Sequence, residues 1–185
     1  MKEASAYLGK AFQPSLWAAA FFCSLCGGAA ASERAVQLVN SFEVMCTVEP
    51  LNYAALEAKA LAMKLPERRT IKTPPAASGY YNWSRSWLLP LKSGPHEFVA
   101  SETRGPAGLI EGCGIGAPDV GGEDFRAILV KTMKLGQPSR QETSPDGSRR
   151  MIVWRWAGDA LTLIDASPAS KPGIYLSLFN QSADR

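Results

Sequence analysis

A glycine-rich run with a cysteine inside it is the first place where this sequence could do chemistry. The run, residues 109–125, reads LIEGCGIGAPDVGGEDF, and its Gly112, Gly114 and Ala117 match the G-x-G-x-x-G/A spacing of a dinucleotide-binding loop. Such a loop needs a helix directly after the glycines and a buried parallel strand after that helix. Here Pro118 and a second glycine pair precede the helix, and the polar segment SRQET follows it. We therefore expect no dinucleotide and no other cofactor.

The cysteine in this run, Cys113, could be a reactive thiol or half of a disulfide. A reactive thiolate needs a helix N-terminus or basic neighbours, whereas the sequence around Cys113 offers Glu111 and no cation. Cys46 is the second cysteine outside the N-terminal apolar segment, and in an exported chain such a pair is most simply one disulfide. It would close a loop of roughly 70 residues, which stabilises a fold by about 4 kcal/mol. Two buried free thiols or an intermolecular bridge are the alternatives.

Acid–base and metal chemistry find few candidates. His96 is the only histidine, so a Ser-His-Asp arrangement would have to use it, and no nucleophile elbow lies nearby. Paired carboxylates could do acid–base work, but Glu102, Glu111 and Asp165 are scattered over the predicted strands. One histidine and a bonded cysteine pair cannot supply a zinc site without several carboxylates, and no calcium-loop pattern is present. We therefore predict no catalytic residue and no metal site.

Tryptophan is the residue type that best suggests a contact with a partner. Five tryptophans occur in the chain, and Trp154 and Trp156 are two residues apart, which places them on the same face of a strand. Packing in the core is one interpretation. The other is an exposed aromatic strip that binds a ligand or partner. The residues of this possible partner-binding strip are Trp83, Trp87, Trp154 and Trp156.

Charge excludes nucleic acid as the expected partner. The net charge is +3, and removal of the N-terminal segment lowers it slightly. Nucleic-acid binding needs a clustered basic face. Smaller basic groups favour either a solvated surface or weak contact with lipid headgroups, cell-wall polymers or an acidic protein patch. These groups are Lys64, Arg68, Arg69 and Lys72, and Arg149, Arg150 and Arg155.

The N-terminus predicts export. Two early lysines precede the apolar run LWAAAFFCSLC, and Ala29 and Ala31 form the A-x-A pattern that signal peptidase recognises. The run is shorter than the ~20 residues that span a bilayer. We therefore expect a signal peptide at residues 1–31, a single domain at residues 32–185, no membrane span after cleavage, and a periplasmic or secreted location. A buried N-terminal helix is the alternative.

Three helices should support the candidate residues. The first begins near Glu33 and carries Cys46 on its apolar face. Pro50 ends it, and Asn52 caps a second helix over residues 53–64. A third helix starts after Gly121-Gly122 and has an apolar inner face. The residues of that face are Phe125, Ile128, Leu129 and Met133.

Strands account for most of the remaining chain. Residues 67–78 are polar and contain prolines, which predicts a loop. Alternating segments bounded by turns predict strands at residues 85–89, 97–103, 107–115, 149–156, 160–166 and 174–179, with residues 138–143 leading into the second group. The fold class is therefore α+β: an N-terminal helix pair and an antiparallel sheet of about five to six strands, with one further helix between the strand groups.

Two short motifs carry a resemblance. The first helix ends in FEVMC, from Phe42 to Cys46, and the strand with the second cysteine reads EGCGIG. This arrangement resembles a set of small exported proteins of Gram-negative bacteria whose function is not established. The resemblance covers most of the mature chain. It implies an exported α+β domain and assigns no catalytic residue.

The sequence therefore favours an exported binding or interaction domain over an enzyme. Its partner would be an envelope protein or a cell-wall component, and the Cys46–Cys113 disulfide would stabilise it. One alternative is a cell-envelope hydrolase or thiol-dependent enzyme, which would need a polar cleft. Another is a structural envelope protein, which would expose a large apolar strip and form oligomers.

Overall fold

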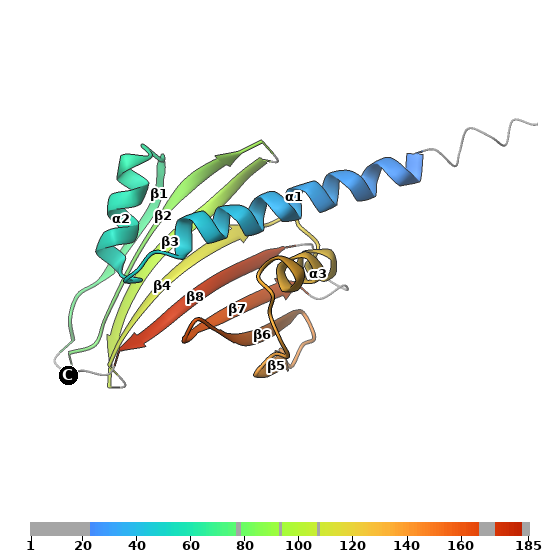
Figure 1. Cartoon of the computed structure of the whole chain (residues 1–185). Helices are drawn as coiled ribbons and strands as arrows, with labels where there is room; N and C mark the ends of the chain where they lie inside the picture. Colours follow the sequence, from blue (N-terminus) through green and yellow to red (C-terminus); the bar gives the residue numbers. More distant parts are fainter. Residues whose placement is uncertain (1–22, 77–78, 93, 107, 167–172, 183–185) are drawn as a thin grey trace, which may run out of the picture.

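The computed structural model describes residues 23–76, 79–92, 94–106, 108–166 and 173–182. These residues form an α+β fold of helices and one antiparallel sheet (Figure 1). The elements in chain order are α1 (Cys23–Cys46), α2 (Tyr53–Ala62), β1 (Glu67–Thr73), β2 (Tyr81–Leu91), β3 (Gly94–Gly105), β4 (Gly108–Ala117), α3 (Gly122–Thr132), β5 (Arg140–Thr143), β6 (Arg149–Trp156), β7 (Asp159–Ala166) and β8 (Ile174–Ser182).

The sheet has eight strands in the order β1-β2-β3-β4-β8-β7-β6-β5. Its first four strands form one meander and its last four form another, and each meander follows a helix. The two meanders join where β4 pairs with β8, with Cys113 opposite Leu178. The strand order is therefore symmetric about this junction, although the sequence shows no internal repeat. Because Cys113 is on β4, it lies near the middle of the sheet.

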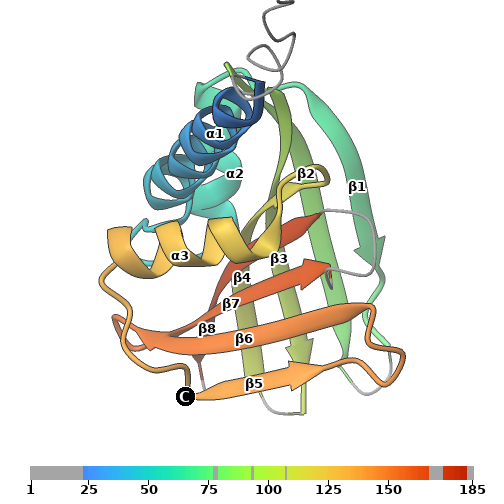
Figure 2. The same ribbon diagram turned by 90° about the vertical axis from the view of Figure 1, so that its right-hand side faces the viewer.

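All three helices pack on the same face of the sheet (Figures 1 and 2). Buried residues of α1 recur at steps of three and four, from Ala35 through Leu38 and Phe42, as one face of a helix requires. They meet the apolar side chains of every second strand residue, such as Leu176 and Leu178 of β8. The core is the layer between this helix face and this sheet face.

The number of strands is the main difference from the sequence prediction. The prediction of about five to six strands is too low, because residues 67–73 form strand β1 instead of a loop and Arg140–Thr143, before the second predicted group, forms strand β5. Nearly all side chains of β1 are exposed, so it lacks the apolar alternation that predicts strands. It pairs at the sheet edge with β2, where Arg85 contacts Glu67 of β1 and Glu57 of α2.

Helix α1 begins well before Glu33, where the sequence predicted its start. It runs from Cys23 through the predicted cleavage position after Ala31. The described buried face begins only at Ala35, and Figure 1 shows the first turns of α1 reaching past the sheet. Among the described residues, no helix is long and apolar enough to cross a membrane. Residues 1–22 lie outside the described part, so the signal peptide remains a prediction.

The starts of the two shorter helices agree with the predictions. Asn52 caps α2, because its side chain accepts a hydrogen bond of 2.8 Å from the backbone N–H of Ala55. Helix α3 begins at Gly122, with Glu123 and Asp124 in its first turn, where the helix dipole favours acidic side chains. A Cβ atom at Gly122 would lie 2.5 Å from the Asp165 carboxylate of β7. Only glycine therefore lets α3 begin this close to the sheet.

Candidate functional site

The glycine-rich run that suggested a cofactor loop is strand β4. Cys113 faces the helices, and the residues on either side of it face away from them. A Cβ atom at Gly112 would lie 2.7 Å from the ring of Phe179, and one at Gly114 would lie 2.3 Å from the hydroxyl of Tyr175. These glycines therefore make room for two aromatic rings of β8.

Cys46 and Cys113 form the predicted pair. Their Sγ atoms are at disulfide distance, 1.96 Å, and their Cα atoms are 5.4 Å apart, which is within the usual range for a disulfide. Both residues are fully buried in the core. The pair links the C-terminal end of α1 to the middle of the sheet. Cys113 therefore has a structural partner and is not accessible as a nucleophile.

The four candidate tryptophans do not form one strip. Trp87 and Trp154 are 0% and 2% exposed and belong to the core, so these two residues are removed from the predicted partner-binding set. Trp83 and Trp156 are half-buried and lie on strands β2 and β6, far apart in the strand order. The core-packing interpretation applies to Trp87 and Trp154, which belong to the core, and to Trp156, which packs against it.

Two of the scattered carboxylates are brought together by the sheet. Glu102 and Glu111 are direct neighbours across β3 and β4. Glu102 accepts a hydrogen bond of 2.6 Å from the hydroxyl of Tyr81, and Glu111 accepts one of 3.0 Å from the backbone N–H of Tyr53. Asp165 lies on β7 and is not part of this pair. Both members of the pair thus hold neighbouring elements in place.

His96 is buried on the helix side of β3, beside an ion pair. It is 1% exposed, and next to it Arg34 of α1 binds Asp119 through two contacts of 2.7 Å. Burial lowers the pKa of His96, the positive charge of Arg34 lowers it further, and Asp119 partly opposes this shift. The imidazole is therefore held neutral inside the fold.

This burial makes folding depend on pH through His96 in the range where carboxyl and tyrosine groups do not titrate. Between about pH 5.5 and 8 the free energy of unfolding should be nearly constant above about pH 6.5 and fall by up to about 1.4 kcal/mol per pH unit below it, because the unfolded chain takes up the proton that folded His96 resists. His96 is the only histidine, so the variant His96→Leu should lose this dependence. Urea unfolding at a series of pH values measures the effect. An equal slope in the variant would contradict it.

The other face of the sheet is also apolar, although no described helix covers it. The half-buried apolar side chains of this helix-free face come from seven strands, and those of β8 are the rings of Tyr175 and Phe179. Its large apolar residues are Ile71, Leu88, Val99, Ile110, Met151, Val153, Ile164, Tyr175 and Phe179. A sheet face with many large apolar side chains and no helix over it can serve as a binding surface. The helix-free face is therefore the candidate functional site.

A sequence signal for this face exists but was missed. Strand β8 contains the segment IYLSLFN, in which Ile174, Leu176 and Leu178 face the helices. The alternate positions also include large rings, at Tyr175 and Phe179. A strand that is apolar on both faces is expected to be covered on both. The pattern of residues 174–179 alone predicts only one more strand of the meander.

Three open hollows lie along the helix-free face. The first, of about 660 Å³, is lined by Arg68, Leu88, Pro95, Glu97, Gly116, Ala117, Pro118 and Ile174. The second, of about 510 Å³, is lined by Ile110, Arg155, Gly158, Asp159, Ala160, Phe179 and Asn180. The third, of about 400 Å³, is lined by Pro118, Arg149, Ile164, Asp165, Gly173, Ile174 and Tyr175. Volumes of this size suit small-molecule ligands.

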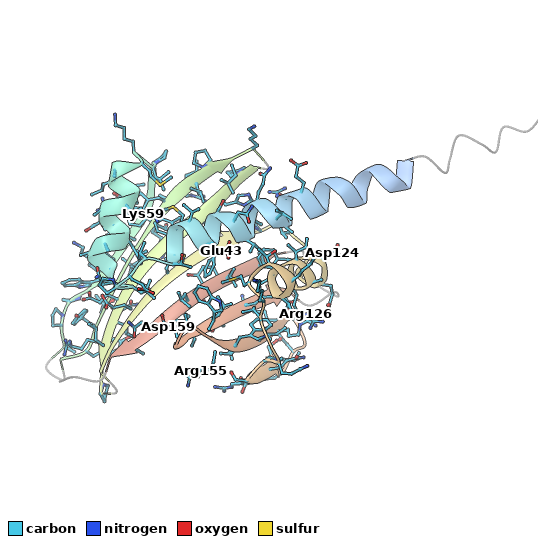
Figure 3. All side chains as sticks on the ribbon, viewed as in Figure 1. Glu43, Lys59, Asp124, Arg126, Arg155 and Asp159 are labelled. Atoms are coloured by element: carbon cyan, nitrogen blue, oxygen red, sulfur yellow. A yellow bond between two sulfur atoms is a disulfide. The ribbon has the colours of Figure 1, made fainter. Side chains whose placement is uncertain are left out.

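Arginine supplies the charge of two hollows. Arg149 and Arg155 stand at the two ends of β6, and neither is in an ion pair among the described residues. The acidic side chains at these hollows point to the other face of the sheet. Asp165 is bonded to Arg150 on the helix side. Asp159 precedes Ala160, which faces the hollow, and successive strand residues point to opposite faces. Figure 3 shows Arg155 and Asp159 at the same end of the sheet. Each hollow thus combines apolar walls with one cation.

Tyr175 lies between the first and third hollows. Burial raises the pKa of Tyr175 to about 12, and the negative charge of Glu97 adds to the rise. The phenol is therefore neutral near pH 7. Its ring is a wall of the third hollow and lies beside Gly116 of the first, and its hydroxyl leans over Gly114.

No metal chemistry is evident in the described part of the chain, where no three His, Cys, Asp or Glu side chains are grouped to hold an ion. Comparison with protein-family models, curated proteins and solved structures found no match. The site must therefore be interpreted from its own geometry.

Proposed function

We propose that this protein is an exported binding domain without a catalytic role, and that it binds its partner on the helix-free face of the sheet. The observation that carries the proposal is that large apolar side chains line a sheet face that no described helix covers. The hollows on that face provide the shape of a binding surface. The partner class expected from the sequence is an envelope protein or a cell-wall component.

The cysteine pair supports both the export and the non-catalytic part of this proposal. Disulfides persist in oxidising compartments such as the periplasm, and the sulfur atoms of Cys46 and Cys113 are at bonding distance. The thiol-enzyme alternative would need Cys113 as a free nucleophile. Cleavage after Ala31 would leave every described core residue of α1, from Ala35 onward, in the mature chain.

Native mass spectrometry of the chain purified from the exporting cell tests the proposal. The expected result is a mature chain that starts near Ser32 and carries a non-covalently bound partner. The variant Ile164→Glu should lose this partner, because it places a charge among the half-buried apolar residues of the helix-free face.

The matched control is Leu61→Glu, which makes the same chemical change at a residue of α2 that is 55% exposed on the helix side. This control should keep the partner. A chain that carries no partner, or an Ile164→Glu variant that keeps it as well as the control does, would contradict the proposed binding face. A full-length chain with residues 1–31 attached would contradict export.

A further inference from the structure

The hollow around Arg149 has the composition of a binding site for an anion attached to an apolar group. Its apolar walls include Pro118, Ile164 and the ring of Tyr175, and its charged lining residues in the described part of the chain are Arg149 and Asp165. The Asp165 carboxylate is occupied by Arg150, with distances of 2.5 and 3.2 Å, on the far side of the sheet. An exposed guanidinium beside apolar walls and without a carboxylate attracts a carboxylate or a phosphate.

The neighbouring hollow extends this site with mostly apolar surface. The two hollows share Pro118 and Ile174, and the larger one continues over Gly116 to Leu88 and Pro95. Arg68 and Glu97 place one positive and one negative charge at the rim of the larger hollow. The two charges offset each other, so this hollow has no net charge that would attract an ion. It therefore fits the uncharged part of a ligand whose anionic end is at Arg149.

Gly116 keeps the floor of this larger hollow open. A Cβ atom there would meet only the ring of Tyr175 at 3.5 Å and a backbone oxygen at 3.9 Å, which are ordinary contacts. Gly112 and Gly114 differ, because rings of β8 already occupy the space above them. The space above Gly116 is thus available to a ligand.

We propose that the Arg149 hollow and the Gly116 hollow together bind a single-chain anionic amphiphile. Its carboxylate or phosphate lies at Arg149, and its hydrocarbon chain passes the ring of Tyr175 and crosses Gly116 toward Leu88. This inference rests on the proposed binding role of the helix-free face and names its ligand. The two open hollows, of about 660 and 400 Å³, place apolar walls beside one guanidinium, which suits a molecule with one apolar chain and one anionic end.

Titration with dodecanoate, kept below its micelle concentration, tests the ligand class. Calorimetry on the mature chain should show saturable binding of dodecanoate, weaker binding of the neutral dodecyl maltoside, and none of acetate, which lacks the chain. Dodecyltrimethylammonium should also fail to bind, because Arg149 repels its head. Binding of dodecanoate should weaken as salt is added.

Two variants locate the site. Arg149→Gln should raise the dissociation constant for dodecanoate about tenfold or more, because a charge-assisted hydrogen bond is lost. Gly116→Leu should abolish binding by filling the larger hollow. Arg126→Gln on α3 (Figure 3), which lines neither hollow, is the control and should bind as the parent chain does. Arg149 is exposed and is in no ion pair among the described residues, so Arg149→Gln should fold. This variant therefore still tests the site if Gly116→Leu does not fold.

The possible outcomes separate this inference from the proposed function. Equal binding of dodecanoate and dodecyl maltoside, independent of Arg149, would overturn the anionic ligand and leave the binding face in place. Binding only to phosphatidylglycerol vesicles, and not to free dodecanoate, would indicate a membrane surface and also overturn the inference. If no amphiphile binds while a partner co-purifies and is lost from Ile164→Glu, the inference fails and the proposed function stands.

Discussion

Replacing Arg150 by methionine should lower the free energy of unfolding by about 3–5 kcal/mol, because it leaves a carboxylate buried without its counter-charge. Asp165 is 1% exposed and receives two contacts from the Arg150 guanidinium. A third contact, of 2.7 Å, joins Arg150 to Glu123 at the start of α3. Arg150 therefore ties the helix to the sheet. Urea unfolding at neutral pH measures the loss.

Two further variants test whether the buried charge causes this loss. The double variant Arg150→Met with Asp165→Asn should recover most of the stability, because no unpaired charge remains in the core. Arg126→Met removes the other partner of Glu123, at 3.2 Å, from an exposed pair, and should cost no more than about 1 kcal/mol. If the two single variants lose equal stability, Arg150 has no special role.

Removing the Cys46–Cys113 bond should cost about 4 kcal/mol under oxidising conditions, because the pair closes a long loop in the unfolded chain. The double variant Cys46→Ala with Cys113→Ala is the suitable change. Alanine avoids the unpaired hydroxyl that serine would bury at two positions that are 0% and 1% exposed. The measurement is the free energy of unfolding of the mature chain with and without reductant.

The reductant provides the control. With the bond reduced, the parent chain should unfold much as the double variant does, apart from the packing lost with two sulfur atoms. An intact-mass measurement should show two protons fewer in the oxidised parent chain. Equal stability of parent and variant under oxidising conditions, with no mass difference on reduction, would show that the pair does not bond.

Local patterns predicted the elements that have strong signals of their own. Asn52 and Gly121-Gly122 set the starts of α2 and α3, and apolar alternation predicted most strands close to where they lie. Strand β1 was missed because it is an edge strand with exposed side chains on both faces. Its strand form depends on backbone pairing with β2, which leaves no apolar pattern in the chain.

The candidate site was harder to predict than the fold. Basic residues that include Arg149 and Arg155 were noted in the sequence, with anionic partners as one interpretation, but nothing placed them beside apolar hollows. Of the tryptophans that suggested a binding strip, Trp87 and Trp154 belong to the core, Trp156 packs against it and Trp83 is half-buried, because burial depends on what covers each strand position. Tyr175 and Gly116 meet only through the pairing of β4 with β8.

By itself, the sequence determined the α+β class, the three helices, the pairing of Cys46 with Cys113 and the expectation of export. Those features depend on residue types, short-range periodicity and the number of cysteines. Only the tertiary structure decided that two meanders join at β4 and β8 and that the three described helices cover one face. It also decided that the other face keeps apolar side chains and open hollows. The physical reason is that strand order, and which face the helices cover, are set by contacts between residues far apart in the chain.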